Sequence, residues 1–443
     1  MSWMEEYKRK LKTAHDALRC VESGMRVYIH PGCSEPEALV EALMERAPYV
    51  RDVEIVHLMT MGTAPYIAPE MAGHFRHNAM FIGANVRDAV NDGRADYTPV
   101  FISEIEGLFE RGDMPLDVAL VQLSPPDAHG FCSLGMGVDT TLTAAKCAKH
   151  VVAQINDKMP RTYGDSFIHI KDLHAIVEDS RPLCELPKVE ITDLHRAIAR
   201  NVATLIEDGA TLQTGIGGIP DAVLPFLTDR KDLGVHSELI SDNIIPLIEA
   251  GVINGRRKSF RPRKVVVGFA LGTRKLFDYV HENPIFEFRA SSYTNDPMNI
   301  ARNDNMVAIN SALQVDLTGQ VCSDSIGSYF YSGIGGQVDF LRGSSRARGG
   351  KPIIALPSTA KNDTMSRIVP MLSPGAGVAT SRGLIRYVVT EHGIAYLHGR
   401  SIRQRAEALI QIAHPKFRDE LYEFCERTKW LQRDNIRAVS GAR

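Results

Sequence analysis

The sequence repeats one segment near the start of each half. The segment G-M-R-V-Y-I-H-P-G-C-S-E-P-E-A-L-V-E-A-L begins at Gly24, and G-A-T-L-Q-T-G-I-G-G-I-P-D-A-V-L-P-F-L begins at Gly209. With one gap, the aligned pairs are Gly24 with Gly209, Pro36 with Pro220, Ala38 with Ala222 and Leu43 with Leu227. Each copy then runs into a short predicted strand that ends in histidine, His57 or His236. The repeat predicts a duplicated α/β unit.

Short β-rich runs alternate with helical patterns along both halves, which favours parallel sheets with helices on their faces. The expected strands are 25–29, 53–57, 79–82, 118–123, 150–154, 210–213, 233–236, 264–268, 306–309, 353–356 and 385–389. The expected helices are 36–46, 83–91, 102–111, 138–147, 191–208 with Asp193 as its cap, and two helices within 401–430 that break at His414-Pro415. The predicted fold class is therefore α/β, with two similar open-sheet domains in tandem.

The segment 179–188 separates the two halves. It contains Pro182 and Pro187 and follows the last expected strand of the first series. We place the boundary near residue 185, which predicts domains 1–185 and 186–443. Two such domains form a cleft between their loop ends, and a cleft of this kind is a favoured place for a site.

Composition excludes several classes of function. Net charge is −2 across 443 residues, so no basic field indicates nucleic acid, and no apolar run reaches the ~18–20 residues that span a membrane. The segment 1–19 is charged and lacks the apolar core of a secretory signal. Seven cysteines occur without a C-x-x-C pair, and 15 histidines occur without zinc-ligand spacing. We expect a cytoplasmic protein with reduced thiols and no metal.

A glycine turn follows the expected strand 210–213. Gly215, Gly217 and Gly218 precede Pro220, which occupies the first turn of an expected helix. Such a turn lets a ligand approach backbone N–H groups and suits an anion or a developing oxyanion. It matches neither G-x-G-x-x-G nor a P-loop, and a tight strand-to-helix connection also explains it. A second turn, at 332–340, repeats the pattern.

Glu238 lies just beyond the expected strand 233–236. An acid at the end of a strand in an open α/β sheet lies where ligands bind. It suits a nucleophile, a general base or a metal ligand. The alternative is an acid at the N-terminus of a helix, because 244–250 has a helical pattern.

Eight motifs along the chain together resemble the acetyl-CoA hydrolase/transferase family of class I CoA-transferases. They are S-P-P-D-A-H-G-F-C-S-L-G at 124–135, M-P-R-T-Y-G-D-S-F-I-H at 159–169, Q-T-G-I-G-G-I-P at 213–220, H-S-E at 236–238, N-S-A-L-Q-V-D-L-T-G-Q-V at 310–321, S-G-I-G-G-Q-V-D-F at 332–340, L-P-S-T-A at 356–360 and T-E-H-G-I-A at 390–395. Within the family the chain looks most like 4-hydroxybutyrate and butyryl-CoA:acetate CoA-transferases. The resemblance implies two CoA-transferase domains with the active site between them.

The resemblance also implies site residues. Glu238 would be the catalytic glutamate, and CoA would contact Gly215, Ile216, Gly217, Gly218, Ile219, Leu313 and Gly336. The expected oxyanion and substrate contacts are Gln213, Gly217, Gly218 and Gln337. The acyl pocket is not defined by the motifs; the segment 59–66 is our hypothesis for part of it.

The chemistry that follows is ping-pong transfer of CoA between an acyl-CoA and a short-chain carboxylate. Glu238 would form a glutamyl-CoA thioester, with 4-hydroxybutyrate or butyrate and acetate as expected substrates and no cofactor besides CoA itself. The alternatives are an acyl-CoA hydrolase that uses the same glutamate, and a non-catalytic CoA- or phosphosugar-binding protein. A homodimer is compatible with the chain length and the C-terminal helices.

Overall fold

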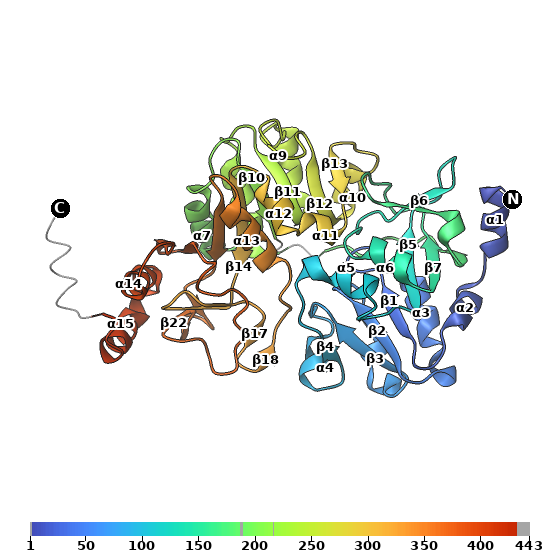
Figure 1. Ribbon diagram of the computed structural model, residues 1–443, viewed down its shortest axis with the longest axis horizontal. Helices are drawn as coiled ribbons and strands as arrows, with labels where there is room; N and C mark the ends of the chain where they lie inside the picture. The colour runs from blue at the N-terminus through green and yellow to red at the C-terminus, as the bar shows by residue number, and fades with distance from the viewer. Residues whose placement is uncertain (1, 187–188, 216, 432–443) are drawn as a thin grey trace.

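The chain folds into two halves, each built on one large sheet (Figure 1). A computed structural model describes residues 2–186, 189–215 and 217–431. Ile216 and part of the expected linker, 187–188, lie outside the described residues. Within the described residues, no helix is long and apolar enough to cross a membrane.

The first sheet has seven parallel strands in the order β4-β3-β2-β1-β5-β7-β9. Their bounds are β1 (Arg26–Ile29), β2 (Val53–His57), β3 (Phe75–Ala79), β4 (Asp96–Tyr97), β5 (Val118–Leu123), β7 (His150–Ile155) and β9 (Ala175–Glu178). Every residue of β5 is buried, as expected for a central strand covered on both faces.

The second sheet has eight strands in the order β13-β12-β11-β10-β14-β19-β23-β24. Their bounds are β10 (Thr211–Thr214), β11 (Gly234–Ile240), β12 (Val265–Ala270), β13 (Phe286–Phe288), β14 (Met306–Ser311), β19 (Lys351–Ala355), β23 (Tyr387–Thr390) and β24 (Gly393–Tyr396). Only β24, paired with β23, runs antiparallel among the described strands of this sheet. The first seven strands of the second sheet repeat the strand order of the first sheet, so the predicted duplication is confirmed.

Helices cover the faces of both sheets (Figure 1). In the first half they are α1 (Trp3–Lys10), α2 (Ala14–Ala17), α3 (Glu37–Met44), α4 (Arg87–Asn91), α5 (Ile102–Glu110) and α6 (Thr141–Cys147). In the second half they are α7 (Asp193–Ala203), α8 (Gly218–Val223), α9 (Ile245–Glu249), α10 (Arg274–Val280), α11 (Ser291–Thr294), α12 (Pro297–Ala301), α13 (Gln337–Arg346), α14 (Ile402–Ile412) and α15 (Arg418–Arg427). The remaining strands are short pieces outside the two large sheets: β6 (Phe131–Ser133), β8 (Phe167–His169), β15 (Gln314–Asp316), β16 (Val321–Cys322), β17 (Ser325–Ile326), β18 (Tyr329–Phe330), β20 (Thr359–Ala360), β21 (Met365–Ser366) and β22 (Ile368–Val369).

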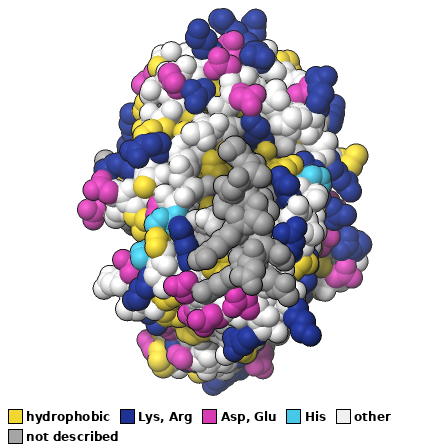
Figure 2. Space-filling view, turned by 90° about the vertical axis from the view of Figure 1, so that its left-hand side faces the viewer, with side chains coloured by type: hydrophobic (Ala, Val, Ile, Leu, Met, Phe, Trp, Pro, Cys, Tyr) yellow, Lys and Arg dark blue, Asp and Glu magenta, His cyan; other side chains and the backbone are white. Residues whose placement is uncertain are grey.

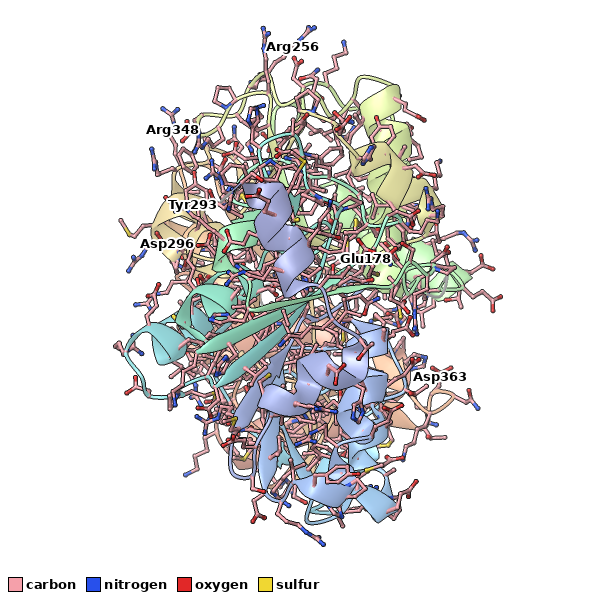
Figure 3. The ribbon with its side chains drawn as sticks, turned by 90° about the vertical axis from the view of Figure 1, so that its right-hand side faces the viewer. Glu178, Arg256, Tyr293, Asp296, Arg348 and Asp363 are labelled. Carbon is pink, nitrogen blue, oxygen red and sulfur yellow. The ribbon has the colours of Figure 1, made fainter. Side chains whose placement is uncertain are left out.

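The N-terminal helix α1 packs on the outer edge of the first sheet. In Figure 3 this edge faces the viewer. The Tyr7 hydroxyl of α1 donates a 2.7 Å hydrogen bond to Glu178, which ends the edge strand β9. On the opposite side of the molecule, basic and acidic side chains are interspersed (Figure 2), in keeping with the low net charge.

Three local predictions were wrong. The third strand is Phe75–Ala79 rather than 79–82, because its alternating buried and exposed side chains pair in register with β2. Thr192, rather than Asp193, caps α7, since its hydroxyl accepts from the His195 N–H. The strand predicted at 233–236 continues to Ile240.

The register also changes how the two repeats align. Arg26 pairs with Glu54, and Thr211 pairs with Gly234. Since Arg26 and Thr211 are equivalent in the repeat, counting four residues on from each partner makes Leu58 the counterpart of Glu238. The two histidines that end the second strand of each copy, His57 and His236, are therefore one position apart.

Candidate active site

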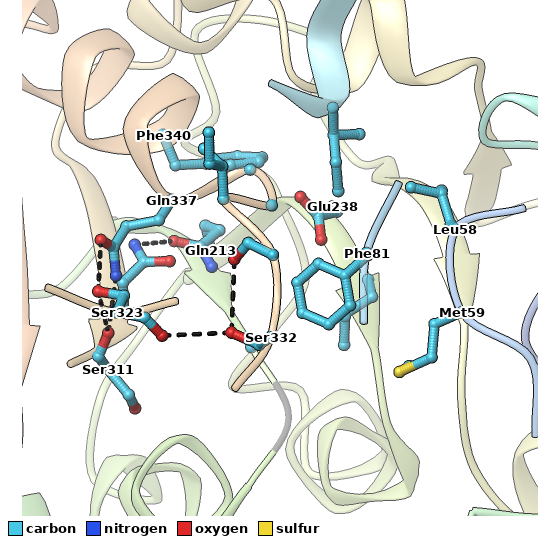
Figure 4. Close-up of a pocket in the computed structure, with 18 of the residues that line it drawn as sticks. Leu58, Met59, Phe81, Gln213, Glu238, Ser311, Ser323, Ser332, Gln337 and Phe340 are labelled. Atoms are coloured by element: carbon cyan, nitrogen blue, oxygen red, sulfur yellow. Dashed lines mark hydrogen bonds between the residues drawn. The ribbon is translucent and has the colours of Figure 1, made fainter. Parts of the chain in front are cut away.

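A pocket of about 380 Å³ lies between the two halves, with Glu238 at its centre (Figure 4). Its wall from the first half is mainly apolar and includes Leu58, Met59 and Phe81. Its opposite wall, from the second half, is rich in amides and hydroxyls: Gln213, Asn310, Ser311, Ser323, Ser332 and Gln337. The pocket thus joins an apolar side and a hydrogen-bonding side at a single carboxylate.

Glu238 is held inside a strand. It belongs to β11, so the alternative role as an acid at a helix N-terminus is wrong. Asn295 Nδ2 donates a 2.7 Å hydrogen bond to its Oε2, while the side chain still borders the pocket. Burial raises the pKa of Glu238 to about 7; the Asn295 hydrogen bond opposes this rise, and the negative charges of Asp339 and Asp139 add to it. The carboxylate is therefore poorly solvated.

Gly336, which has no side chain, places its backbone directly against this carboxylate. It is the N-cap of α13, so the predicted second turn does open a helix. A Cβ built on Gly336 would stand 1.8 Å from Glu238 Oε2 and 2.2 Å from Asn295 Nδ2. Any side chain at this position would overlap the site. The N-terminus of a ten-residue helix therefore meets the Glu238 carboxylate.

Among the described residues of the first glycine turn, Gly215 alone borders the pocket. Gly215 lines the pocket, and Gly217 caps α8 with φ 119°, a conformation that favours glycine. A Cβ on Gly218 would lie 2.4 Å from the His195 ring, so this glycine permits close packing of α7 on α8. Ile219 is buried, 5% exposed. Gly217, Gly218 and Ile219 are not among the residues that line the pocket.

Both predicted glutamines line the pocket, and both amides are already engaged. Gln337 Nε2 donates to the Ser311 carbonyl at 2.7 Å, and its Oε1 accepts from Ser323 Oγ at 2.9 Å (Figure 4). Gln213 Oε1 accepts from Asn310 Nδ2 at 3.0 Å. Leu313, expected to contact CoA, pairs its backbone N–H with Cys322 and is not among the lining residues.

Sequence reasoning missed three polar residues beside Glu238. Asn295 follows α11, Asp139 precedes α6, and Asp339 lies in the first turn of α13. Asn295 and Asp139 lie in none of the family motifs, and Asp339 was interpreted only as part of the second glycine turn. Within the segment 59–66, Met59 lines the pocket. Tyr66 is buried instead, and its hydroxyl lies 2.6 Å from His57 Nε2.

Comparison with known proteins identifies the family. The acetyl-CoA hydrolase/transferase N-terminal domain matches residues 1–186, and the C-terminal domain matches residues 272–425. The chain is 53% identical to a 4-hydroxybutyrate coenzyme A transferase of Clostridium kluyveri, over 95% of this chain and 98% of that protein. It is 49% identical to a succinyl-CoA:acetate/propanoyl-CoA:succinate CoA transferase of Fasciola hepatica, over 90% and 84%.

A solved structure agrees with these sequence matches. The crystal structure of a 4-hydroxybutyrate CoA-transferase from Porphyromonas gingivalis superposes with a TM-score of 0.84 at 40% identity, covering 96% of this chain and all of that one. The fold and pocket define a two-domain α/β protein of the CoA-transferase type. The chain belongs to the acetyl-CoA hydrolase/transferase family, as one of its CoA-transferases.

Proposed function

We propose that this protein moves CoA between an acyl-CoA and a short-chain monocarboxylate through a covalent intermediate on Glu238. The observation that carries the proposal is the placement of Glu238. It is a partly desolvated carboxylate at the centre of the pocket, held by Asn295 and met by the N-terminus of α13. The expected substrates are 4-hydroxybutyrate or butyrate, with acetate and acetyl-CoA.

The first half-reaction transfers CoA to the enzyme. A Glu238 oxygen attacks the thioester carbonyl, and the tetrahedral intermediate collapses with loss of CoA thiolate, leaving an acyl-glutamyl anhydride. The thiolate then attacks the glutamyl carbonyl, and the acyl group leaves as a free carboxylate. The enzyme now carries a glutamyl-CoA thioester. An incoming carboxylate reverses these steps and departs as the new acyl-CoA.

Each tetrahedral intermediate places negative charge on an oxygen beside Glu238. Asn295 Nδ2 and the N-terminus of α13 offer hydrogen-bond donors beside Glu238, and they add to the donors expected from Gln213 and Gln337. One well-placed donor of this kind contributes roughly 3–4 kcal/mol to the transition state. Because one thioester replaces another, the proposed route needs neither a nucleotide nor a metal.

The direct test of the proposal is the mass of the active-site peptide. After incubation with acetyl-CoA alone, we expect the peptide that contains Glu238 to gain the mass of CoA less one water, since the thioester forms before any acceptor arrives. Addition of 4-hydroxybutyrate should remove the adduct and yield 4-hydroxybutyryl-CoA. A peptide of unchanged mass, together with intersecting double-reciprocal plots, would contradict the covalent route. Loss of the adduct to water at the rate of transfer would favour the hydrolase alternative.

The lining of the pocket predicts selection against a second carboxylate on the substrate. Among the described lining residues the charged side chains are Asp139 and Glu238, both acidic. The second carboxylate of succinate would enter this site without a cation to offset its lost hydration. Butyrate, 4-hydroxybutyrate and succinate form a matched four-carbon series that differs only at C4.

With acetyl-CoA as donor, we expect kcat/KM for butyrate and 4-hydroxybutyrate to exceed that for succinate by about 100-fold. The ratio between butyrate and 4-hydroxybutyrate then reports whether the end of the acyl chain meets a polar group. Equal kcat/KM values for succinate and butyrate would show that the dianion finds a cation, and would overturn the predicted selectivity. The experiment matters because one 49% identical relative is named for succinyl-CoA.

A further inference from the structure

Helix α5 of the first half lies at the boundary with the second half. It spans Ile102–Glu110 and packs against α11, beside which it lies in Figure 1. Ser103 and Glu106 are three residues apart in the helix, so they share one face. That face meets the two segments of the second half that contact Glu238.

The first contact ties α5 to the glycine turn at Gly336. Asp339, in the first turn of α13, accepts two hydrogen bonds from Ser103: 2.8 Å from the hydroxyl and 3.2 Å from the backbone N–H. The Ile102 N–H also reaches the Gly335 carbonyl, at 3.4 Å. Two N–H groups at the start of α5, which have no acceptor within the helix, are therefore bonded to the segment 335–339, and Gly336 of this segment lies against Glu238.

The second contact ties α5 to the segment that carries Asn295. Glu106 is 2% exposed, and its Oε1 accepts a 2.6 Å hydrogen bond from the Ser292 N–H in α11. Its Oε2 is bonded to the Thr143 hydroxyl. One turn later, the Asn295 N–H donates to the Ser291 carbonyl at 2.9 Å, so the position of α11 determines where the Asn295 amide points.

We propose that Ser103 and Glu106 are positioning residues, which hold Gly336 and Asn295 against Glu238 from across the boundary between the halves. This inference rests on the proposed role of Glu238 as nucleophile. It adds a separate role for the first half. Besides forming a wall of the pocket, the first half determines how Gly336 and Asn295 are placed against the Glu238 carboxylate. A small displacement of such contacts lowers the rate of a chemical step much more than the binding of substrate.

The Ser103 contact is tested with a matched pair, Ser103→Thr and Ser103→Val. Both replacements are β-branched and of equal size, and only threonine keeps the hydroxyl that Asp339 accepts. We expect Ser103→Thr to form glutamyl-CoA in a single turnover within about 3-fold of the wild type. Ser103→Val should be about 10-fold slower or more, the effect of losing a hydrogen bond to a charged group, with little change in KM for acetyl-CoA.

The Glu106 contact is tested in the same way with Glu106→Gln and Glu106→Met. Glutamine keeps an acceptor for the Ser292 N–H, whereas methionine leaves that buried donor without a partner. We expect the methionine variant to form glutamyl-CoA about 10-fold more slowly than the glutamine variant. If Ser103→Val does not fold, this second pair decides the question.

Equal rates within each matched pair, or a loss confined to KM, would overturn the inference. This outcome is distinct from failure of the proposed function. If Glu238 is not the nucleophile, no variant forms the adduct, and the wild type does not form it either. If it is, and the matched pairs behave alike, only the positioning role is lost.

Discussion

Glu238→Ala is expected to abolish CoA transfer while the folded protein still binds CoA. The side chain lies in β11, and its loss removes the carboxyl group whose oxygen forms the anhydride and whose carbon forms the thioester in the proposed route. We expect the transfer rate to fall by at least about 10⁴-fold, the scale seen when a nucleophile is removed. The melting temperature should change little, because a desolvated carboxylate is costly to bury.

A matched variant separates chemistry from packing at this position. Glu238→Gln keeps the size of the side chain and an oxygen that can accept from Asn295 Nδ2. It cannot form the anhydride, so we expect the same loss of rate as in Glu238→Ala. The measurements are initial rates with acetyl-CoA and butyrate, the mass of the active-site peptide, and CoA affinity by calorimetry. Retained turnover in either variant would remove Glu238 from the nucleophile role.

The second large effect is expected from Gly336→Ala. The φ angle of this residue is −95°, which alanine adopts without strain, so the effect comes from space alone. The new methyl group would start 1.8 Å from Glu238 Oε2 and must displace either the carboxylate or the glycine turn. A displacement of about 1 Å at a reacting group costs roughly 100-fold in rate, and we expect kcat to fall by at least that factor.

Gly383→Ala is the control for this change. A Cβ there would approach only the Ser381 hydroxyl, at 3.8 Å, an ordinary contact. It should leave both kcat and the melting temperature unchanged, while Gly336→Ala lowers kcat and the yield of glutamyl-CoA. If Gly336→Ala transferred CoA at the rate of the control, the close approach of α13 to the nucleophile would not matter for catalysis.

The fold was predictable from the sequence because its signals are local. Runs such as 118–121 and 151–153 are continuous and apolar, and the repeat at Gly24 and Gly209 indicates that the unit occurs twice. The exact register was not predictable. A one-residue difference in strand pairing depends on neighbours that are distant in the sequence, and the strand-ending histidines His57 and His236 are one position apart once the strands are paired.

The site was predictable only in part, for the same reason. Three of the predicted residues lie in recognisable sequence motifs, and the structure brings them to one pocket: Glu238, Gln213 and Gln337. Asn295 and Asp139 lie outside those motifs. Asn295 bonds to Glu238 and Asp139 acts on it through its charge, and the Ser291 N–H of α11 donates to the Asp139 carbonyl across the boundary between the halves. No pattern in the sequence around Asn295 or Asp139 predicts that either residue lies near Glu238.

The shared register has a consequence for how such a site can change over time. Leu58 and Glu238 occupy equivalent positions of the two repeats, and both face the same pocket. In a dimer of identical subunits, one substitution would alter both positions at once. In this chain the two positions are encoded separately, so the first half can change the shape of the pocket wall while the second half keeps Glu238, the proposed nucleophile. Substitutions that change the substrate range can then accumulate in the first half without changing the chemistry at Glu238.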